Sequence, residues 1–203
     1  MLRFLIALFV ISVAVQTCHA QILRSFGLKA AYTSANQSIN SSSEGLDRRP
    51  GVCAALFAEW LNDPCVSVVS QVEYVQRGTR FTVHPTIPEL FWMHWNVDIR
   101  IDYLSMPLFF KVRLPLTVLT PYIFGGPRLD VLLSHRSTDL DIDYLDPKKS
   151  SFGASVGIGV EIAHLLPGQL LVEGRYNADL TAAYPSEYPY RNNAFDIWIG
   201  FGF

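Results

Sequence analysis

The sequence has few charged residues and only one long apolar run. Charged residues make up 17% of its 203 residues, and the net charge is −2. Disordered chains are rich in charge and poor in apolar residues, whereas half of this sequence is hydrophobic, so a disordered protein is excluded. The pI of about 6.2 also removes the basic surface on which nucleic-acid binding usually depends, so we expect no nucleic-acid partner. The length suits one domain.

The single long apolar run lies at the extreme N-terminus. A positive residue precedes an apolar core over residues 4–15, and small residues stand at −3 and −1 of a cleavage site between Ala20 and Gln21. The core is shorter than the roughly 20 residues that a transmembrane helix needs, and no charge cluster follows it. We therefore predict a cleavable signal peptide. A lipoprotein signal that uses Cys18 ranks second, because the residues before it suit lipidation poorly.

Only two cysteines, Cys53 and Cys65, remain after this segment. An exported chain enters a compartment that permits a disulfide. However, the residues at 62–64 look like a turn between two extended segments, and Cys53 lies about eight residues before it, or roughly 26 Å at the rise of a strand. A disulfide requires Cα atoms within about 7 Å. We therefore predict two free, buried thiols.

The remaining hydrophobicity is distributed as every second residue. In the last segment the apolar face consists of Phe195, Ile197, Ile199, Phe201 and Phe203. Eight segments with this alternation are predicted as strands, at residues 27–36, 51–61, 66–78, 104–114, 122–133, 152–162, 170–180 and 195–203. Short connections at 62–64, 115–120 and 165–168 alternate with long ones at 37–50, 79–98, 134–151 and 181–194. Short turns on one side and long loops on the other are typical of a transmembrane β-barrel.

The alternation alone leaves open which face is inside. A soluble secreted binding barrel would bury its apolar face. Eight apolar faces carry roughly forty side chains, more than the interior of an eight-stranded barrel can hold. The polar face also carries glycines, which make room in a crowded interior but only weaken a strand that faces solvent: Gly126, Gly153, Gly157, Gly159, Gly200 and Gly202. Aromatic residues near the strand ends fit the girdles of a membrane barrel: Trp60, Tyr74, Phe110, Phe152, Tyr176 and Phe203.

We therefore predict an all-β fold. A signal peptide over residues 1–20 precedes an eight-stranded antiparallel up-and-down transmembrane β-barrel over residues 21–203. The predicted location is the bacterial outer membrane, and the predicted partners are outer-membrane lipid and the outer-membrane assembly machinery.

The inner face of this barrel collects charges of both signs. Six cations and seven anions are predicted to form a lumen charge network: Lys29, Glu59, Glu73, Arg77, Lys111, Arg113, Arg128, Asp130, Glu161, Glu173, Arg175, Asp179 and Asp196. Unpaired charge is costly in a narrow interior of low dielectric constant, so near balance implies pairing. Barrels that form aqueous channels typically have 16 or more strands. We favour a closed, salt-bridged interior over a narrow porin-like channel for small solutes.

Other chemical signals are weak, and we predict no catalytic residue, no metal site and no cofactor. The aspartates of the third long loop lack the glycine and final glutamate of an EF-hand: Asp139, Asp141, Asp143 and Asp146. A lipid-modifying enzyme could pair a loop histidine with a serine, but nothing fixes a triad geometry; the histidines are His84, His94 and His135, and the serines are Ser134 and Ser137. An aromatic loop over residues 91–95 could contact the outer leaflet or a partner, and an unknown ligand or protein at the external loops stays open.

Several motifs resemble the PorT-type outer-membrane β-barrel family of the Bacteroidetes group, a small porin family. They are Gly27-Leu28-Lys29, Gly51 to Glu59, Gln71 to Gly78, Tyr103 to Leu108 with Lys111, Pro121-Tyr122 with Gly126-Pro127, Phe152 to Glu161, and Arg175-Tyr176-Asn177. Ser105 and Gln71 depart from the acidic residues expected there. The resemblance implies an outer-membrane barrel, mostly without a defined activity, and carries over no catalytic residue.

The C-terminus resembles the signal that the outer-membrane assembly machinery reads. Its residues are Phe195, Ile197, Ile199, Phe201 and Phe203. Taken together, the sequence predicts a small non-enzymatic outer-membrane barrel with a largely closed lumen and external loops available for binding.

Overall fold

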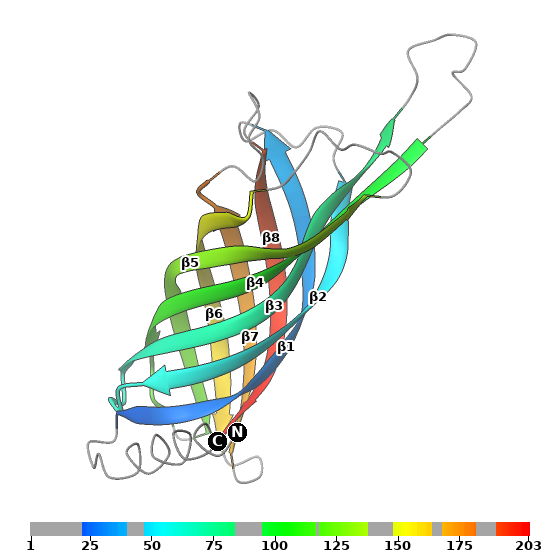
Figure 1. Cartoon of the computed structure of the whole chain (residues 1–203). Coiled ribbons are helices and arrows are strands. Elements are labelled where there is room, and N and C mark those ends of the chain that lie inside the picture. The colour runs from blue at the N-terminus through cyan, green and yellow to red at the C-terminus, as the bar shows by residue number, and fades with distance from the viewer. Residues whose placement is uncertain are drawn as a thin grey trace, which may run out of the picture.

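The computed structural model describes residues 22–39, 47–83, 95–116, 118–137, 148–163, 168–181 and 190–203. These residues form a closed barrel of eight antiparallel strands (Figure 1). The strands are β1 (Leu23–Ile39), β2 (Asp47–Trp60), β3 (Val66–Val83), β4 (Trp95–Arg113), β5 (Leu119–Ser137), β6 (Ser150–Ala163), β7 (Gln169–Asp179) and β8 (Tyr190–Gly202).

Each strand pairs with its neighbours in the sequence, and β8 closes the barrel on β1. The predicted eight-stranded up-and-down barrel is therefore confirmed. The end of the barrel that carries the short connections is called the turn end below, and the opposite end is called the loop end. Within the described ranges, no helix is long and apolar enough to cross a membrane.

The strands reach further at the loop end than the alternation predicted. β3 ends at Val83 and β4 starts at Trp95, and these two residues are paired, so the β3–β4 hairpin projects beyond the rest of the barrel (Figure 1). β5 ends at Ser137, which lies opposite Ile99 of β4. The pairing of β4 with β5 shifts between Asp102 and Tyr103, which marks a β-bulge. Beyond this bulge the outward side chains are polar, so the period-two pattern of apolar residues stops although the backbone pairing continues.

The apolar face points outward, as predicted. Outward side chains such as Leu28 and Ile158 are 59% and 67% exposed, whereas the inward Trp198 is fully buried. The inner face is crowded, and the glycines there are required for space. A Cβ at Gly157 would overlap the ring of Phe124 on the neighbouring strand. This distribution is the reverse of a soluble barrel and is that of a barrel surrounded by lipid.

The two cysteines of the barrel differ in their surroundings. Both are free, but only Cys53, on the inner face, is buried, whereas Cys65 is exposed. The prediction of two buried thiols is therefore wrong for Cys65. It lies in the turn between β2 and β3, outside the region where packing covers the side chains.

The predicted signal peptide, Cys18, and the cleavage site at Ala20 and Gln21 lie outside the described residues. So do His84, His94, the four loop aspartates, and residues 91–94 of the aromatic loop.

Candidate functional site

The interior of the barrel holds the largest cluster of chemically reactive side chains. All thirteen charged residues predicted for the lumen lie on the inner face and are buried. The alternation of each strand places them there, because side chains two residues apart point to the same face. Ion pairs involve twelve of the thirteen, and they form three tiers between the turn end and the loop end.

The tier nearest the turn end is centred on Glu59 of β2. The Lys111 ammonium lies 3.0 Å from one oxygen of this carboxylate and also pairs with Glu161. The guanidinium of Arg113 pairs with the other Glu59 oxygen. Nε of Arg24, at the start of β1 at the turn end, lies 3.3 Å from that same oxygen. Two carboxylates therefore pair with three cations from two strands, β1 and β4.

The middle tier is centred on Arg175 of β7. Its Nη1 lies 2.6 Å from a Glu73 oxygen, across the barrel from it, and its Nη2 lies 3.5 Å from Glu173. Glu173 also pairs with Lys29. The Arg175 guanidinium lies 4.6 Å from the centre of the Trp198 ring, which adds a cation–π contact.

Two further aromatic rings enclose Arg175. Phe109 and Phe124 lie 4.8 Å and 5.7 Å from its guanidinium, and both belong to a buried apolar cluster. The middle of the barrel is therefore filled by an arginine and large rings, not by small polar side chains.

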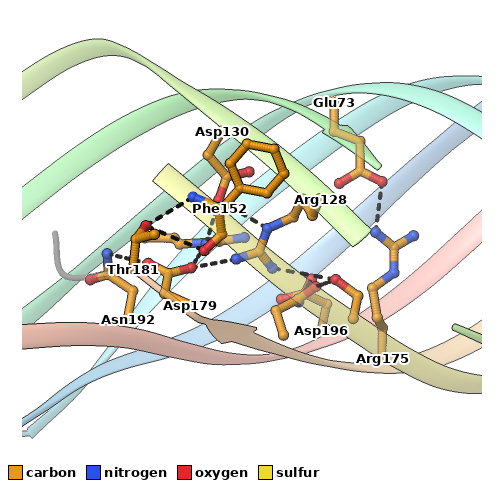
Figure 2. Close-up of polar contacts among 12 residues, drawn as sticks. Glu73, Arg128, Asp130, Phe152, Arg175, Asp179, Thr181, Asn192 and Asp196 are labelled. Atoms are coloured by element: carbon orange, nitrogen blue, oxygen red, sulfur yellow. Dashed lines mark hydrogen bonds and ion pairs between the residues drawn. The ribbon is translucent and has the colours of Figure 1, made fainter. Parts of the chain in front are cut away.

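The tier nearest the loop end contains two arginines and two aspartates. Figure 2 shows Arg128 of this tier with Asp130 and Asp179. Nη1 of Arg77 lies 3.1 Å from Asp130 and 3.2 Å from Asp179. Arg128 contacts the same two carboxylates, with its Nε 2.9 Å from Asp130. The Asn192 amide donates to Asp179 over 3.0 Å. Each charge is thus shared by two partners of opposite sign.

Neutral residues outside the predicted set also join the network, among them Tyr122, Asn177 and Trp198. The Tyr122 hydroxyl donates to Glu173 over 2.8 Å. Asp196, the charge outside the ion pairs, accepts hydrogen bonds from Asn177 over 2.6 Å and from the Trp198 indole over 3.4 Å. Their position on the inner face follows from the same alternation that identified the charges, but their partners depend on which strands face each other across the barrel.

The charged side chains of the interior are closely packed. Arg113, Arg128 and Arg175 are at most 1% exposed. Among the residues that the structure covers, no group of histidine, cysteine, aspartate or glutamate is arranged to hold a metal ion. The described interior is therefore packed with charges that compensate each other.

A hydrolase arrangement at Ser134 and His135 does not form as the sequence hypothesis required. The Ser134 hydroxyl donates directly to Asp102 over 3.2 Å, on the outer face. His135 is the next residue of β5, so its ring points to the opposite face. A triad needs the histidine between the serine and the carboxylate.

The turn at the opposite end is capped by Asp63. Its carboxylate accepts hydrogen bonds from the backbone N–H groups of Cys65 and Val66, over 2.8 Å and 2.9 Å. These bonds to the ionised form hold the pKa of Asp63 below its ordinary value. The cap fixes the start of β3 and thereby the pairing of β2 with β3.

The closed eight-stranded barrel, its apolar outer face and its charged interior define a small outer-membrane β-barrel protein. The sequence pattern of the outer membrane protein beta-barrel domain family matches residues 19–183. The chain belongs to this family, and its location is the bacterial outer membrane. No curated protein sequence matches the chain.

Solved structures of small outer-membrane barrels resemble this one. OprG from Pseudomonas aeruginosa matches with a TM-score of 0.51 at 10% identity, over 89% of this chain and 95% of OprG. Neisserial surface protein A matches with a TM-score of 0.49 at 16% identity, over 87% of this chain and 97% of its own. The attachment invasion locus protein Ail of Yersinia pestis matches with a TM-score of 0.44 at 13% identity, over 88% of this chain and 98% of Ail. At these identities the likeness is one of fold.

Proposed function

We propose that the protein is a non-enzymatic outer-membrane barrel whose lumen is closed by its own ion pairs and whose external loops serve binding. One observation carries the proposal: the interior cations and anions neutralise each other in three tiers while their side chains are buried. An ion-selective pore instead needs charges that remain available to a passing ion. The arginine and aromatic rings of the middle tier occupy the cross-section that such an ion would cross.

The test is single-channel recording in planar bilayers with the folded barrel. We expect no steady ion current from the wild type. Matched recordings use a variant in which Arg175 and Glu73 are both replaced by alanine, which removes the central ion pair of the middle tier while Glu173 keeps Lys29 as its partner. This variant is expected to open more often than the wild type. A steady current through the wild-type barrel would overturn the closed-lumen proposal in favour of a narrow channel for small solutes.

A lipid-modifying activity is the second candidate, and the geometry at Ser134 and His135 weighs against it. Mass spectrometry of lipid A from cells with and without the protein tests this directly. Unchanged acylation is the result that we expect.

We further propose that the chain belongs to the PorT-type branch of small Bacteroidetes barrels, as its motifs suggest, and that its last strand is read by the assembly machinery. The last strand presents Phe195, Ile197, Ile199 and Phe203 outward, each at least 47% exposed. The Phe203 ring lies 6.0 Å from that of Phe26, and the backbones of the two residues exchange hydrogen bonds.

This arrangement provides a matched pair of variants for the assembly signal. Phe203→Ala and Phe26→Ala both remove this ring contact. Phe203→Ala also removes a contact with the Phe201 ring, whose centre lies 5.0 Å away, and only this variant alters the C-terminal residue. Both variants are expected to fold in detergent, as shown by heat-modifiable migration on gels. In cells, Phe203→Ala alone is expected to reduce the amount of folded barrel in the outer membrane. Equal loss with both variants would assign the effect to stability and overturn the signal.

A further inference from the structure

The outer face of the barrel changes character along β4. From the turn end, the outward residues Val112, Phe110, Leu108, Met106 and Leu104 are all apolar. At about 3.3 Å per residue they cover roughly 26 Å of strand, which fills most of the apolar band of about 25 Å when the strand is tilted. The next outward residues are Asp102, Arg100 and Asp98. The loop-end boundary of the membrane therefore lies just beyond Leu104.

Above this boundary, arginines from four neighbouring strands gather near the loop end: three lie on the outer face, and the fourth, on β2, contacts Asp98 of that face. They are Arg49 of β2, Arg80 of β3, Arg100 of β4 and Arg136 of β5, and we call them the rim arginines. Asp98 lies among them, 2.6 Å from Nε of Arg49 and 2.9 Å from Nε of Arg80.

The rest of the cluster is built around Arg100. Its Nε lies 2.9 Å from Asp102, and its Nη2 donates to the Tyr74 hydroxyl over 3.1 Å. Among the side chains that the structure describes, four guanidinium groups in this row share two carboxylates, so positive charge is in excess at the edge of the lipid-facing surface.

The pairing of β4 with β5 adds a second and independent sign of an anion. Arg100 and Arg136 are directly opposite each other in the register. Residues opposite each other in an antiparallel pair point to the same face, and like charges in this position repel. Asp102 is directly opposite Ser134, whose hydroxyl donates a hydrogen bond to it. The serine itself adds no negative charge beside Arg136. An anion between the two arginines would remove the repulsion.

We propose that the rim arginines bind the phosphate of an outer-leaflet lipid whose acyl chains lie against the apolar outer face of β4 and its neighbours. The occupant is an anionic amphiphile because the cationic row is continuous with the lipid-facing surface and three of its four arginines lie on the same face. Arginine suits this role, since its planar guanidinium can donate two parallel hydrogen bonds to a phosphate. The half-exposed Arg80 and the partly exposed Arg100 have side-chain exposures of 50% and 35%, so both can reach a head group.

The test measures binding of the folded barrel to vesicles of phosphatidylcholine with and without bisphosphorylated lipid A. The variant Arg100→Gln/Arg136→Gln is expected to weaken binding to the lipid A vesicles roughly tenfold or more, as for the loss of two charge-assisted contacts. The matched control is Arg191→Gln, which removes an exposed arginine of β8 at the same end but outside the row. It is expected to bind like the wild type, and heat-modifiable migration verifies that each variant is folded.

A gain of affinity provides the second arm. Asp98→Asn removes the carboxylate that engages Arg49 and Arg80, so binding to lipid A vesicles is expected to strengthen. Vesicles with dephosphorylated lipid A are expected to bind no better than phosphatidylcholine alone. The proposal is overturned if the double variant binds like the wild type, if Arg191→Gln causes the same loss, or if Asp98→Asn leaves the affinity unchanged. Displacement of the lipid by an equal concentration of inorganic phosphate would also overturn it, because the site would then hold a free anion.

Discussion

The ion pair between Arg175 and Glu73 provides the sharpest prediction about stability. Both side chains are at most 2% exposed, and their N–O distance is 2.6 Å. Replacing Arg175 by methionine keeps a side chain of similar length against the rings of the middle tier but leaves the Glu73 carboxylate buried without its main partner. Removing one partner of a buried pair typically costs about 3–5 kcal/mol, because the remaining charge is uncompensated.

Replacing the other partner, Glu73, by glutamine is expected to cost less than Arg175→Met. With Glu73→Gln, Arg175 keeps a hydrogen bond to Gln71 over 3.1 Å and its contacts with Glu173 and Trp198. The double variant leaves no charge unpaired, and we expect its free energy of unfolding to lie within about 1–2 kcal/mol of the wild type. Glu73→Gln should therefore rescue Arg175→Met.

The assay is urea unfolding in a detergent in which the wild type refolds reversibly, with the free energy of unfolding obtained by linear extrapolation. The four proteins form a double-mutant cycle that isolates the coupling between the two residues. If Arg175→Met costs less than about 1 kcal/mol, or if adding Glu73→Gln makes it worse, the charges do not depend on each other and the reasoning about a compensated interior fails.

Three further predictions concern packing, topology and the turn. Gly157→Ala should lower the free energy of unfolding by about 1–3 kcal/mol, because its methyl group overlaps an aromatic ring of β5. Gly174→Ala should be tolerated, because the nearest neighbour of its Cβ lies at 3.7 Å. Equal effects of the two variants in urea unfolding would contradict the packing argument. A bulky maleimide should label Cys65 but not Cys53 in the folded barrel, and it should do so in cells only after the outer membrane is permeabilised; labelling of intact cells would invert the topology. Asp63→Ala should lower the unfolding midpoint at neutral pH, while Asp63→Asn, which keeps an acceptor oxygen, should not. Because the pKa of Asp63 is lowered in the folded state, the stabilisation by its carboxylate is complete above its ordinary pKa of about 3.9 and is lost as the pH falls through the lowered pKa. The unfolding midpoints of the wild type and Asp63→Ala should therefore converge in strong acid.

The outward face, the strand count and the inner charges could be predicted from the sequence because they depend on one local rule. Successive side chains of a strand point to opposite faces, so Phe195, Ile197 and Ile199 had to share a face, and Asp196 and Trp198 the other. Glycines such as Gly157 then identified the crowded side. The prediction that Cys65 is buried was wrong because a turn follows no such periodicity.

The partners within the interior could not be predicted in this way. Arg77 contacts Asp130 and Asp179, which lie 53 and 102 residues away in the sequence. Which inner residues meet across a barrel depends on the stagger between its strands, and this stagger is a property of the closed sheet as a whole.

The row of rim arginines shows the same division. The sequence alone determined that the chain forms an eight-stranded outer-membrane barrel with apolar residues outside and balanced charges inside, because alternation and composition are local properties. Only the tertiary structure extended β4 and β5 beyond the apolar band and set Arg100 opposite Arg136, because strand pairing there is maintained by backbone hydrogen bonds that require no pattern in the side chains.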